Sequence, residues 1–381
     1  MKIKTTLLMA VAGFALITGS ALADNIKIGF NAPLTGFAAS DGESAKNGAE
    51  LAVEQINASG GINGDMLELI VYDDQAAPDK AVPIAQKLIE QDGVVAAVSG
   101  SYSGSTKAAA TIFQESKVPY ISAYAIHPDI TRAGNYVFRT SFVGEVQGRG
   151  GAKLIGEMLG KKRAAIVTIQ NDFGKSLTAG FKEKAADFGI EIVGEYEYSI
   201  KDRQFGPLIS KIKSDNPDVI YATGYFFTAG PFVSQLRAAG IDTPVIGQEG
   251  YDSQTFIKIA GPAAEGTIIT TSLDRDSDAQ VTIDFIKAYE AKSEEKVDMV
   301  AASAHTAVTV LAEALRNAAS MEKAAIRDAI AATNLTASTG QITFNKLGEV
   351  NKSIQVQIVK DGNWHHYGVI DDAVLLAAPT E

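Results

Sequence analysis

The sequence contains no cysteine among its 381 residues, and it has only four histidines and one tryptophan. Without cysteine the chain can form no disulfide bond, no thiolate metal site and no cysteine nucleophile. Attachment to a membrane through a lipidated N-terminal cysteine is excluded for the same reason. Stability must therefore come from packed apolar cores, and the chain is long enough for two domains.

Long apolar runs are also missing, because charged or glycine-rich segments interrupt every hydrophobic stretch after the first 23 residues. The N-terminal stretch has Lys2 and Lys4, an apolar run at residues 7–17 and the small-residue sequence A-L-A at residues 21–23. This order is typical of a secretion signal, and the run is too short to span a bilayer. We expect a signal peptide at residues 1–23, cleavage after Ala23 and a soluble product in the periplasm.

Basic residues are in deficit. Residues 24–381 contain 32 Lys and Arg against 45 Asp and Glu, which gives a net charge of −13. An acidic surface without a basic stripe repels phosphate groups, so nucleic acids and anionic membranes are poor partners. The charge is better interpreted as a source of solubility, and we expect a monomer that binds a small molecule.

Catalytic motifs are absent as well. The sequence has no zinc-protease, phosphate-loop, dinucleotide-binding or nucleophile-elbow motif. His365 and His366 stand beside Trp364 and could be a pair of metal ligands. Adjacent residues on a strand point to opposite faces, however, so the two rings would not share one ion. We therefore expect no enzymatic activity, no cofactor and no metal site. An amidase or a deaminase remains the alternative from another functional class.

What the sequence does contain is a regular alternation of short strands rich in Val and Ile with amphipathic helices. This alternation is typical of parallel sheets that helices cover on both faces, and it occurs in two series. The expected strands are residues 25–30, 67–72, 94–98 and 118–122 in the first series and 164–169, 191–198, 219–223 and 244–246 in the second. The expected helices are residues 49–56, 80–91, 105–114, 147–159, 175–188, 232–239 and 253–259.

The C-terminal third has a different pattern. Three helices are expected in succession at residues 279–292, 300–318 and 321–332, before a strand at 353–360. These helices have no strands of their own, so they should pack on the sheet formed by the first series. The chain would then cross to the second series through the strand at 353–360. We predict an α/β protein of two doubly wound, parallel-sheet lobes joined by a three-strand hinge. The lobes would hold residues 24–143 with 272–351, and residues 144–271 with 352–381.

The segment S-G-S-Y-S-G-S-T at residues 99–106 follows a strand and opens a helix. Its hydroxyl and backbone N–H groups would converge on a helix N-terminus, which favours an anion. A single hydroxyl that caps the helix is the plainer interpretation. The two glycines, which let a ligand approach, keep the binding interpretation open. Facing sheets would place this loop in a cleft between the lobes.

With these residues the sequence resembles the periplasmic binding proteins for leucine, isoleucine and valine, a branch of the type I clamshell family. The resemblance runs through nearly the whole chain after the signal. It is carried by N-A-P-L-T-G at residues 31–36, G-A-E-L-A at 48–52, I-N-A-S-G-G-I at 56–62, Y-D-D at 72–74, S-G-S-T at 103–106, F-R-T at 138–140, L-R-A-A-G at 236–240 and G-Q-E-G at 247–250. It implies the substrate-binding component of an ABC importer for amino acids, with an inner-membrane permease as partner.

The resemblance also implies a binding site. Ser103 would hold the ligand carboxylate, and Glu249 from the other lobe would pair with the ligand ammonium. Tyr225 matches a cleft tyrosine, and Phe173 stands where the family usually has tyrosine. The expected ligand-binding residues are Asp41, Tyr102, Ser103, Gly104, Tyr124, Ala125, Ile126, Phe173, Tyr225 and Glu249. Without the resemblance, Glu249 between glycines would be interpreted as a solvated loop carboxylate.

Three positions depart from the family pattern. Ile126 stands where the family has a threonine that helps bind both ends of the ligand, Asp41 replaces an aromatic residue, and Gly144 replaces a common acidic residue. Tyr124 and Ile126 could instead wall a pocket for an aromatic carboxylate. The sequence thus leaves an aromatic carboxylate or amide open as an alternative to a hydrophobic amino acid. It also leaves open the ligand-sensing subunit of a membrane receptor.

Overall fold

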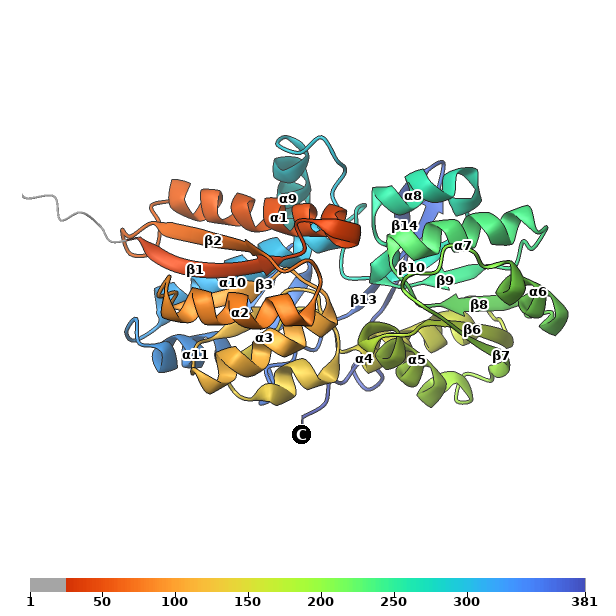
Figure 1. Cartoon of the computed structure of the whole chain (residues 1–381), viewed down its shortest axis with the longest axis horizontal. Helices are drawn as coiled ribbons and strands as arrows, with labels where there is room; N and C mark the ends of the chain where they lie inside the picture. The colour runs from red at the N-terminus through yellow and green to blue at the C-terminus, as the bar shows by residue number, and fades with distance from the viewer. Residues whose placement is uncertain (1–24, 381) are drawn as a thin grey trace, which may run out of the picture.

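The computed structural model describes residues 25–380, so the signal peptide expected at residues 1–23 lies outside the described part. Figure 1 shows two lobes side by side, each with helices packed around one large sheet. Within residues 25–380, no helix combines the length and the apolar character that a bilayer span requires.

The first lobe is built on a five-stranded sheet of order β2-β1-β3-β4-β5, in which every pairing is parallel. Its strands are β1 (Ile26–Ala32), β2 (Leu67–Asp73), β3 (Ala96–Ser99), β4 (Tyr120–Ser122) and β5 (Val137–Arg139). One face is covered by α2 (Pro78–Glu90) and α3 (Ser103–Glu115), and the other by α1 (Ala39–Ala58) and α10 (Met299–Asn317). The central strands are buried on both faces for this reason.

The second lobe holds a seven-stranded sheet of order β14-β13-β10-β9-β8-β6-β7. Its strands are β6 (Arg163–Ile169), β7 (Glu191–Tyr198), β8 (Val219–Ala222), β9 (Val245–Gly247), β10 (Ile268–Thr271), β13 (Ile354–Lys360) and β14 (Asn363–Ile370). Its helices are α4 (Gly144–Lys153), α5 (Asp172–Ala185), α6 (Gly206–Asp215), α7 (Phe226–Ala238) and α8 (Gln254–Ala260). α4 packs with α5, and α7 packs with α8.

The predicted α/β architecture with two sheets is confirmed, but the second sheet is mixed rather than parallel throughout. β13 runs antiparallel to β10, and β14 runs antiparallel to β13. Asp361 and Gly362 form the two-residue connection from β13 to β14 and have φ of 51° and 71°. Positive φ at both positions is typical of the tight turn that joins antiparallel strands, so this Asp-Gly pair dictates a hairpin.

The C-terminal helices lie against the first lobe. α9 (Gln280–Glu290), α10 and α11 (Lys323–Ala331) follow β10, and α10 packs along α1 and against β3. A short antiparallel pair, β11 (Asn334–Ala337) and β12 (Gly340–Thr343), precedes the return to β13. The chain therefore passes between the lobes three times. We propose that these three connecting segments form the hinge, with the lobe boundaries expected from the sequence.

Two helices of the second lobe differ from their predicted bounds for identifiable reasons. α7 begins at Phe226 rather than at residue 232, although it contains Pro231, because the N–H of Tyr225 donates to Thr228 Oγ1 at 3.2 Å and caps its start. α4 ends at Lys153 and continues as a π-helical turn at Leu154–Met158. The spacing of apolar residues that predicts an α-helix does not distinguish such a turn.

A buried ion pair ties the last connecting segment to the first lobe. Arg139, at the end of β5, donates from Nε and Nη2 to the two oxygens of Glu349 at 2.9 and 2.8 Å. The two side chains are 0% and 2% exposed. Arg139 also donates to the carbonyl oxygens of Ala125 and His127 at 3.0 Å, so it fixes the loop that follows β4.

We expect Glu349→Gln to lower the free energy of unfolding by about 3 kcal/mol, because the guanidinium of Arg139 would lose its buried counter-charge. Urea unfolding followed by circular dichroism measures the change. Glu195→Gln is the matched control, since the Lys182–Glu195 pair is about half exposed and should contribute less than about 1 kcal/mol. Equal effects of the two substitutions would show that the buried pair does not hold the lobe together.

Candidate ligand-binding site

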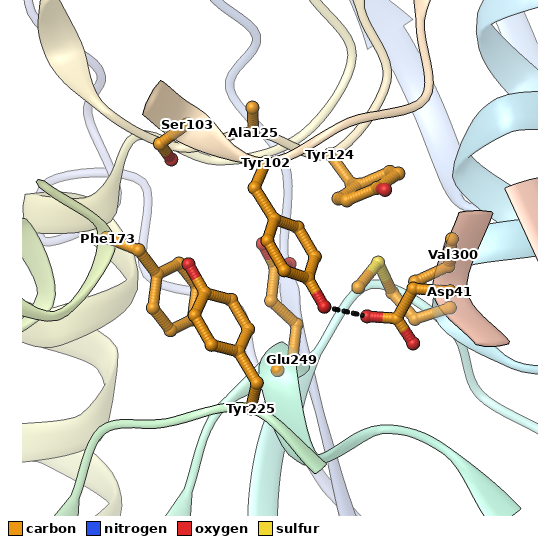
Figure 2. Close-up of a pocket in the computed structure, with 11 residues that line it drawn as sticks. Asp41, Tyr102, Ser103, Tyr124, Ala125, Phe173, Tyr225, Glu249 and Val300 are labelled. Carbon is orange, nitrogen blue, oxygen red and sulfur yellow. Dashed lines mark hydrogen bonds between the residues drawn. The ribbon is translucent and has the colours of Figure 1, made fainter. Parts of the chain in front are cut away.

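A cavity lies between the lobes, where the loops that follow the strands of both sheets meet (Figure 2). The first lobe contributes residues after β3 and β4 and residues at the starts of α1 and α10. The second lobe contributes residues after β6, β8 and β9. The lining consists of Asp41, Tyr102, Ser103, Tyr124, Ala125, Phe173, Tyr225, Glu249, Gly250, Met299 and Val300. Open α/β sheets bind their ligands at this end of the strands.

Eight of the ten residues expected to bind ligand line this cavity, and Gly104 and Ile126 do not. Gly104 faces Pro78, whose Cγ would lie 3.4 Å from a Cβ at this position. Ile126 is buried beside the cavity, and its N–H donates to Ser103 Oγ at 3.3 Å. The sequence analysis missed Met299 and Val300, because apolar residues in the first turn of a helix indicate only a buried helix. The role of the lining residues as ligand contacts stays a prediction.

Ser103 is the first residue of α3, so it places the cavity at a helix N-terminus. In the described part of the chain no side chain caps this helix, so the plainer interpretation of a serine cap is wrong. Ser103 Oγ accepts the N–H of Ile126, which leaves its own hydroxyl hydrogen available to a ligand. The helix end also carries a partial positive charge and N–H groups without helical acceptors. This wall of the cavity therefore favours an anionic group.

Glu249 reaches the cavity from the second lobe, in the short helical turn Glu249–Tyr251 after β9. The next residue must be glycine, since a Cβ at Gly250 would lie 2.2 Å from the carbonyl oxygen of Gly224. The carboxylate is 2% exposed, and its Oε2 lies 3.5 Å from Ser141 Oγ. Oε1 has no hydrogen-bond partner within residues 25–380.

The environment of Glu249 favours a cationic ligand group. Burial raises the pKa of Glu249 to about 8, although the positive charge of Lys352 acts in the opposite direction. A buried carboxylate with an oxygen that lacks a donor is costly, and a hydrogen bond from an ammonium group would offset that cost. The second lobe thus presents the polarity opposite to that of the Ser103 wall.

Aromatic rings bridge the lobes beside these two groups. Phe173 and Tyr225 of the second lobe stack with ring centroids 4.7 Å apart, and Tyr225 stacks on Tyr102 of the first lobe at 4.3 Å (Figure 2). An ion pair between Lys107 of α3 and Asp172 of α5 joins the same two lobes. The cavity measures about 20 Å³, which holds about one water molecule. A molecule of amino-acid size fits between these walls only if the lobes stand farther apart than in this structure.

Asp41 is the second buried carboxylate of the cavity, with 4% exposure, and its Oδ2 accepts a hydrogen bond from the Tyr102 hydroxyl at 2.7 Å. Burial raises the pKa of Asp41 to about 8. The negative charges of Asp298 and Asp252 act in the same direction, and the bond from Tyr102 opposes them. Within residues 25–380, no cluster of three or more His, Asp or Glu side chains is suited to a metal ion.

Comparison with known proteins assigns the family. The model of the family described as periplasmic binding protein matches residues 25–363, which is most of the chain. The chain belongs to this family. The resemblance indicated by the sequence motifs is thereby confirmed. The family consists of binding proteins, not enzymes.

Relatives of this periplasmic binding protein cover nearly its whole length. The leucine-, isoleucine-, valine-, threonine- and alanine-binding protein of Pseudomonas aeruginosa is 33% identical over 90% of this chain and 91% of its own. The branched-chain amino acid transporter substrate-binding protein LivJ of Streptococcus pneumoniae, solved with isoleucine, has a TM-score of 0.86 at 29% identity over 91% of this chain and 99% of LivJ. An ABC transporter solute-binding protein from R. palustris, solved with benzoate, has a TM-score of 0.83 at 26% identity over 92% and 99%.

We expect Asp41→Asn to stabilise the protein at alkaline pH, after refolding to remove any bound ligand. The native pKa of about 8 exceeds the ordinary value of 3.8, so the wild type loses stability as the pH rises from about 4 through 8. Asparagine does not ionise and can still accept the Tyr102 hydroxyl. At pH 9 the variant should exceed the wild type by more than about 1 kcal/mol, and the difference should vanish near pH 4.

Thermal unfolding at the two pH values measures this difference. Glu43→Gln, which removes an exposed carboxylate from the same turn of α1, serves as the control and should show no such pH dependence. A difference between Asp41→Asn and the wild type that is the same at pH 4 and pH 9 would contradict the shifted ionisation.

Proposed function

We propose that this protein is the substrate-binding component of an ABC importer and that it captures amino acids, branched-chain and other hydrophobic ones among them. The observation that carries the proposal is the opposite polarity of the two cavity walls. One wall is the N-terminus of α3 with Ser103, and the other is the buried carboxylate of Glu249. A molecule with a carboxylate and an ammonium group satisfies both walls, and amino acids have this charge pattern. Relatives named for branched-chain amino acids agree with it.

In the proposed pose the ligand carboxylate accepts the Ser103 hydroxyl and the first N–H groups of α3. The ligand ammonium donates to Glu249 Oε1, which has no other donor within the described residues. The side chain then lies among the aromatic rings and the apolar wall formed by Met299 and Val300. Hydrogen bonds between charged groups are strong in a cavity that excludes water.

Capture follows from closure of the lobes around this ligand. The amino acid docks first on the Ser103 wall, and closure then brings Phe173, Tyr225 and Glu249 against it. Because the ligand contacts both lobes only in the closed form, it shifts the population toward that form. The closed protein, a soluble monomer in the periplasm, delivers the amino acid to an inner-membrane ABC permease. The net negative charge of the chain repels phosphate groups, so nucleic acids are not expected as partners.

The benzoate complex of a relative suggests an aromatic carboxylate as a second candidate. The stacked rings of Phe173, Tyr225 and Tyr102 would suit such a ligand. It would however leave Glu249 Oε1 without a hydrogen-bond donor in a closed cavity, at a cost of roughly several kcal/mol. The amino acid fits better because it satisfies both walls.

We expect Ser103→Ala and Glu249→Gln each to weaken amino-acid binding at least about tenfold, the loss typical of a hydrogen bond to a charged group. Isothermal titration with leucine, isoleucine and valine, on protein refolded to remove bound ligand, measures the dissociation constants. Glu195→Gln is the control, since it removes an exposed carboxylate from the second lobe. Undiminished affinity in both site variants would overturn the proposed pose. Benzoate is titrated in parallel, and binding of benzoate but of none of the amino acids would overturn the ligand class.

A further inference from the structure

Asp41 lies in the first turn of α1 and forms part of the cavity wall on the side of Val300 (Figure 2). This side is distinct from the Ser103 and Glu249 walls that the proposed pose assigns to the ligand carboxylate and ammonium. It is the side where the pose puts the amino-acid side chain. This part of the wall would otherwise be apolar, and a carboxylate buried there loses its hydration.

The surroundings of Asp41 supply one hydrogen bond and no cation. Within residues 25–380, the Tyr102 hydroxyl is the one donor to its carboxylate, and the charged groups that act on it are Asp298 and Asp252. Asp252 already holds Arg275, and Asp298 accepts the N–H of Ala301 at 2.8 Å. The nearby positive charge and backbone donor are thus engaged by other carboxylates.

The Tyr102 hydroxyl has one hydrogen, so it donates to only one oxygen of Asp41 at a time. In this structure its ring is stacked on Tyr225 with an angle of 8° between the ring planes. The hydroxyl donates to Oδ2, as the dashed line in Figure 2 shows, and Oδ1 accepts no hydrogen bond from residues 25–380. A hydrocarbon side chain packed against Oδ1 would remove water from it and return no hydrogen bond.

We propose that Asp41 is a specificity-determining residue that selects ligands whose side chain carries a hydrogen-bond donor, such as a hydroxyl or an ammonium group, over hydrocarbon isosteres. The inference rests on the proposed binding of amino acids. It narrows that ligand class by the chemistry of the side chain and leaves the roles of Ser103 and Glu249 unchanged.

Two pairs of amino acids of equal shape test this inference. Threonine and valine differ by a hydroxyl in place of a methyl group, and ornithine and norleucine differ by an ammonium in place of a methyl group. We expect the wild type to bind the donor-bearing member more tightly in at least one pair, by about tenfold or more for a charged donor. Isothermal titration on refolded protein measures the four dissociation constants at pH 8.5, where Asp41, whose pKa is about 8, is mostly ionised.

Asp41→Leu should reverse the preference, because it replaces the carboxylate by a hydrocarbon of similar shape. The variant should bind valine and norleucine more tightly than the wild type does, and this gain cannot arise from misfolding. Glu43→Gln, exposed on the same turn of α1, should leave both ratios unchanged. Equal or tighter binding of the hydrocarbon member in both pairs by the wild type would overturn the role of Asp41 alone. Failure of all four amino acids to bind would overturn the proposed function itself.

Discussion

The lobes of this protein meet over two buried carboxylates that have fewer hydrogen-bond donors than they can accept. Glu249 has an oxygen without a partner in the described chain, and Asp41 receives one hydrogen bond from Tyr102. Closure removes water from both groups, which is unfavourable unless new donors replace that water. A ligand that carries donors offsets this cost, whereas a ligand without them does not. In the proposed function, the desolvation of these acidic groups therefore couples recognition of the ligand to closure.

The backbone positions these groups within each lobe before closure. A Cβ at Gly100 would lie 2.3 Å from the ring of Phe30, so the loop before α3 packs directly on the core of the first lobe. Arg139 holds the loop after β4 by its bond to the carbonyl of Ala125. The contacts between the lobes, by contrast, include side-chain contacts such as Tyr102 with Tyr225. Such contacts can separate and form again while each lobe keeps its internal packing.

The sequence predicts most of the elements and much of the cavity because both follow simple patterns. Tyr225 and Glu249 stand in loops directly after buried strands, where α/β sheets carry their binding residues. Met299 was missed because its place in the cavity depends on how α10 packs, which apolar spacing does not determine. Gly144, which departs from the family pattern, has a packing reason that appears only in three dimensions. A Cβ there would lie 2.1 Å from Ser176 Oγ, so α4 and α5 leave no room for a side chain.

The distribution of these groups between the lobes sets the order of recognition in the proposed pose. Ser103 and Asp41 both belong to the first lobe, whereas Glu249 belongs to the second. A ligand that docks on the first lobe thus presents its carboxylate to Ser103 and its side chain to Asp41 while the cleft is still hydrated. The ammonium meets Glu249 only on closure, and every amino acid carries that group. Discrimination between side chains therefore depends on a residue of the first lobe, and the second lobe responds to a feature that all the ligands share.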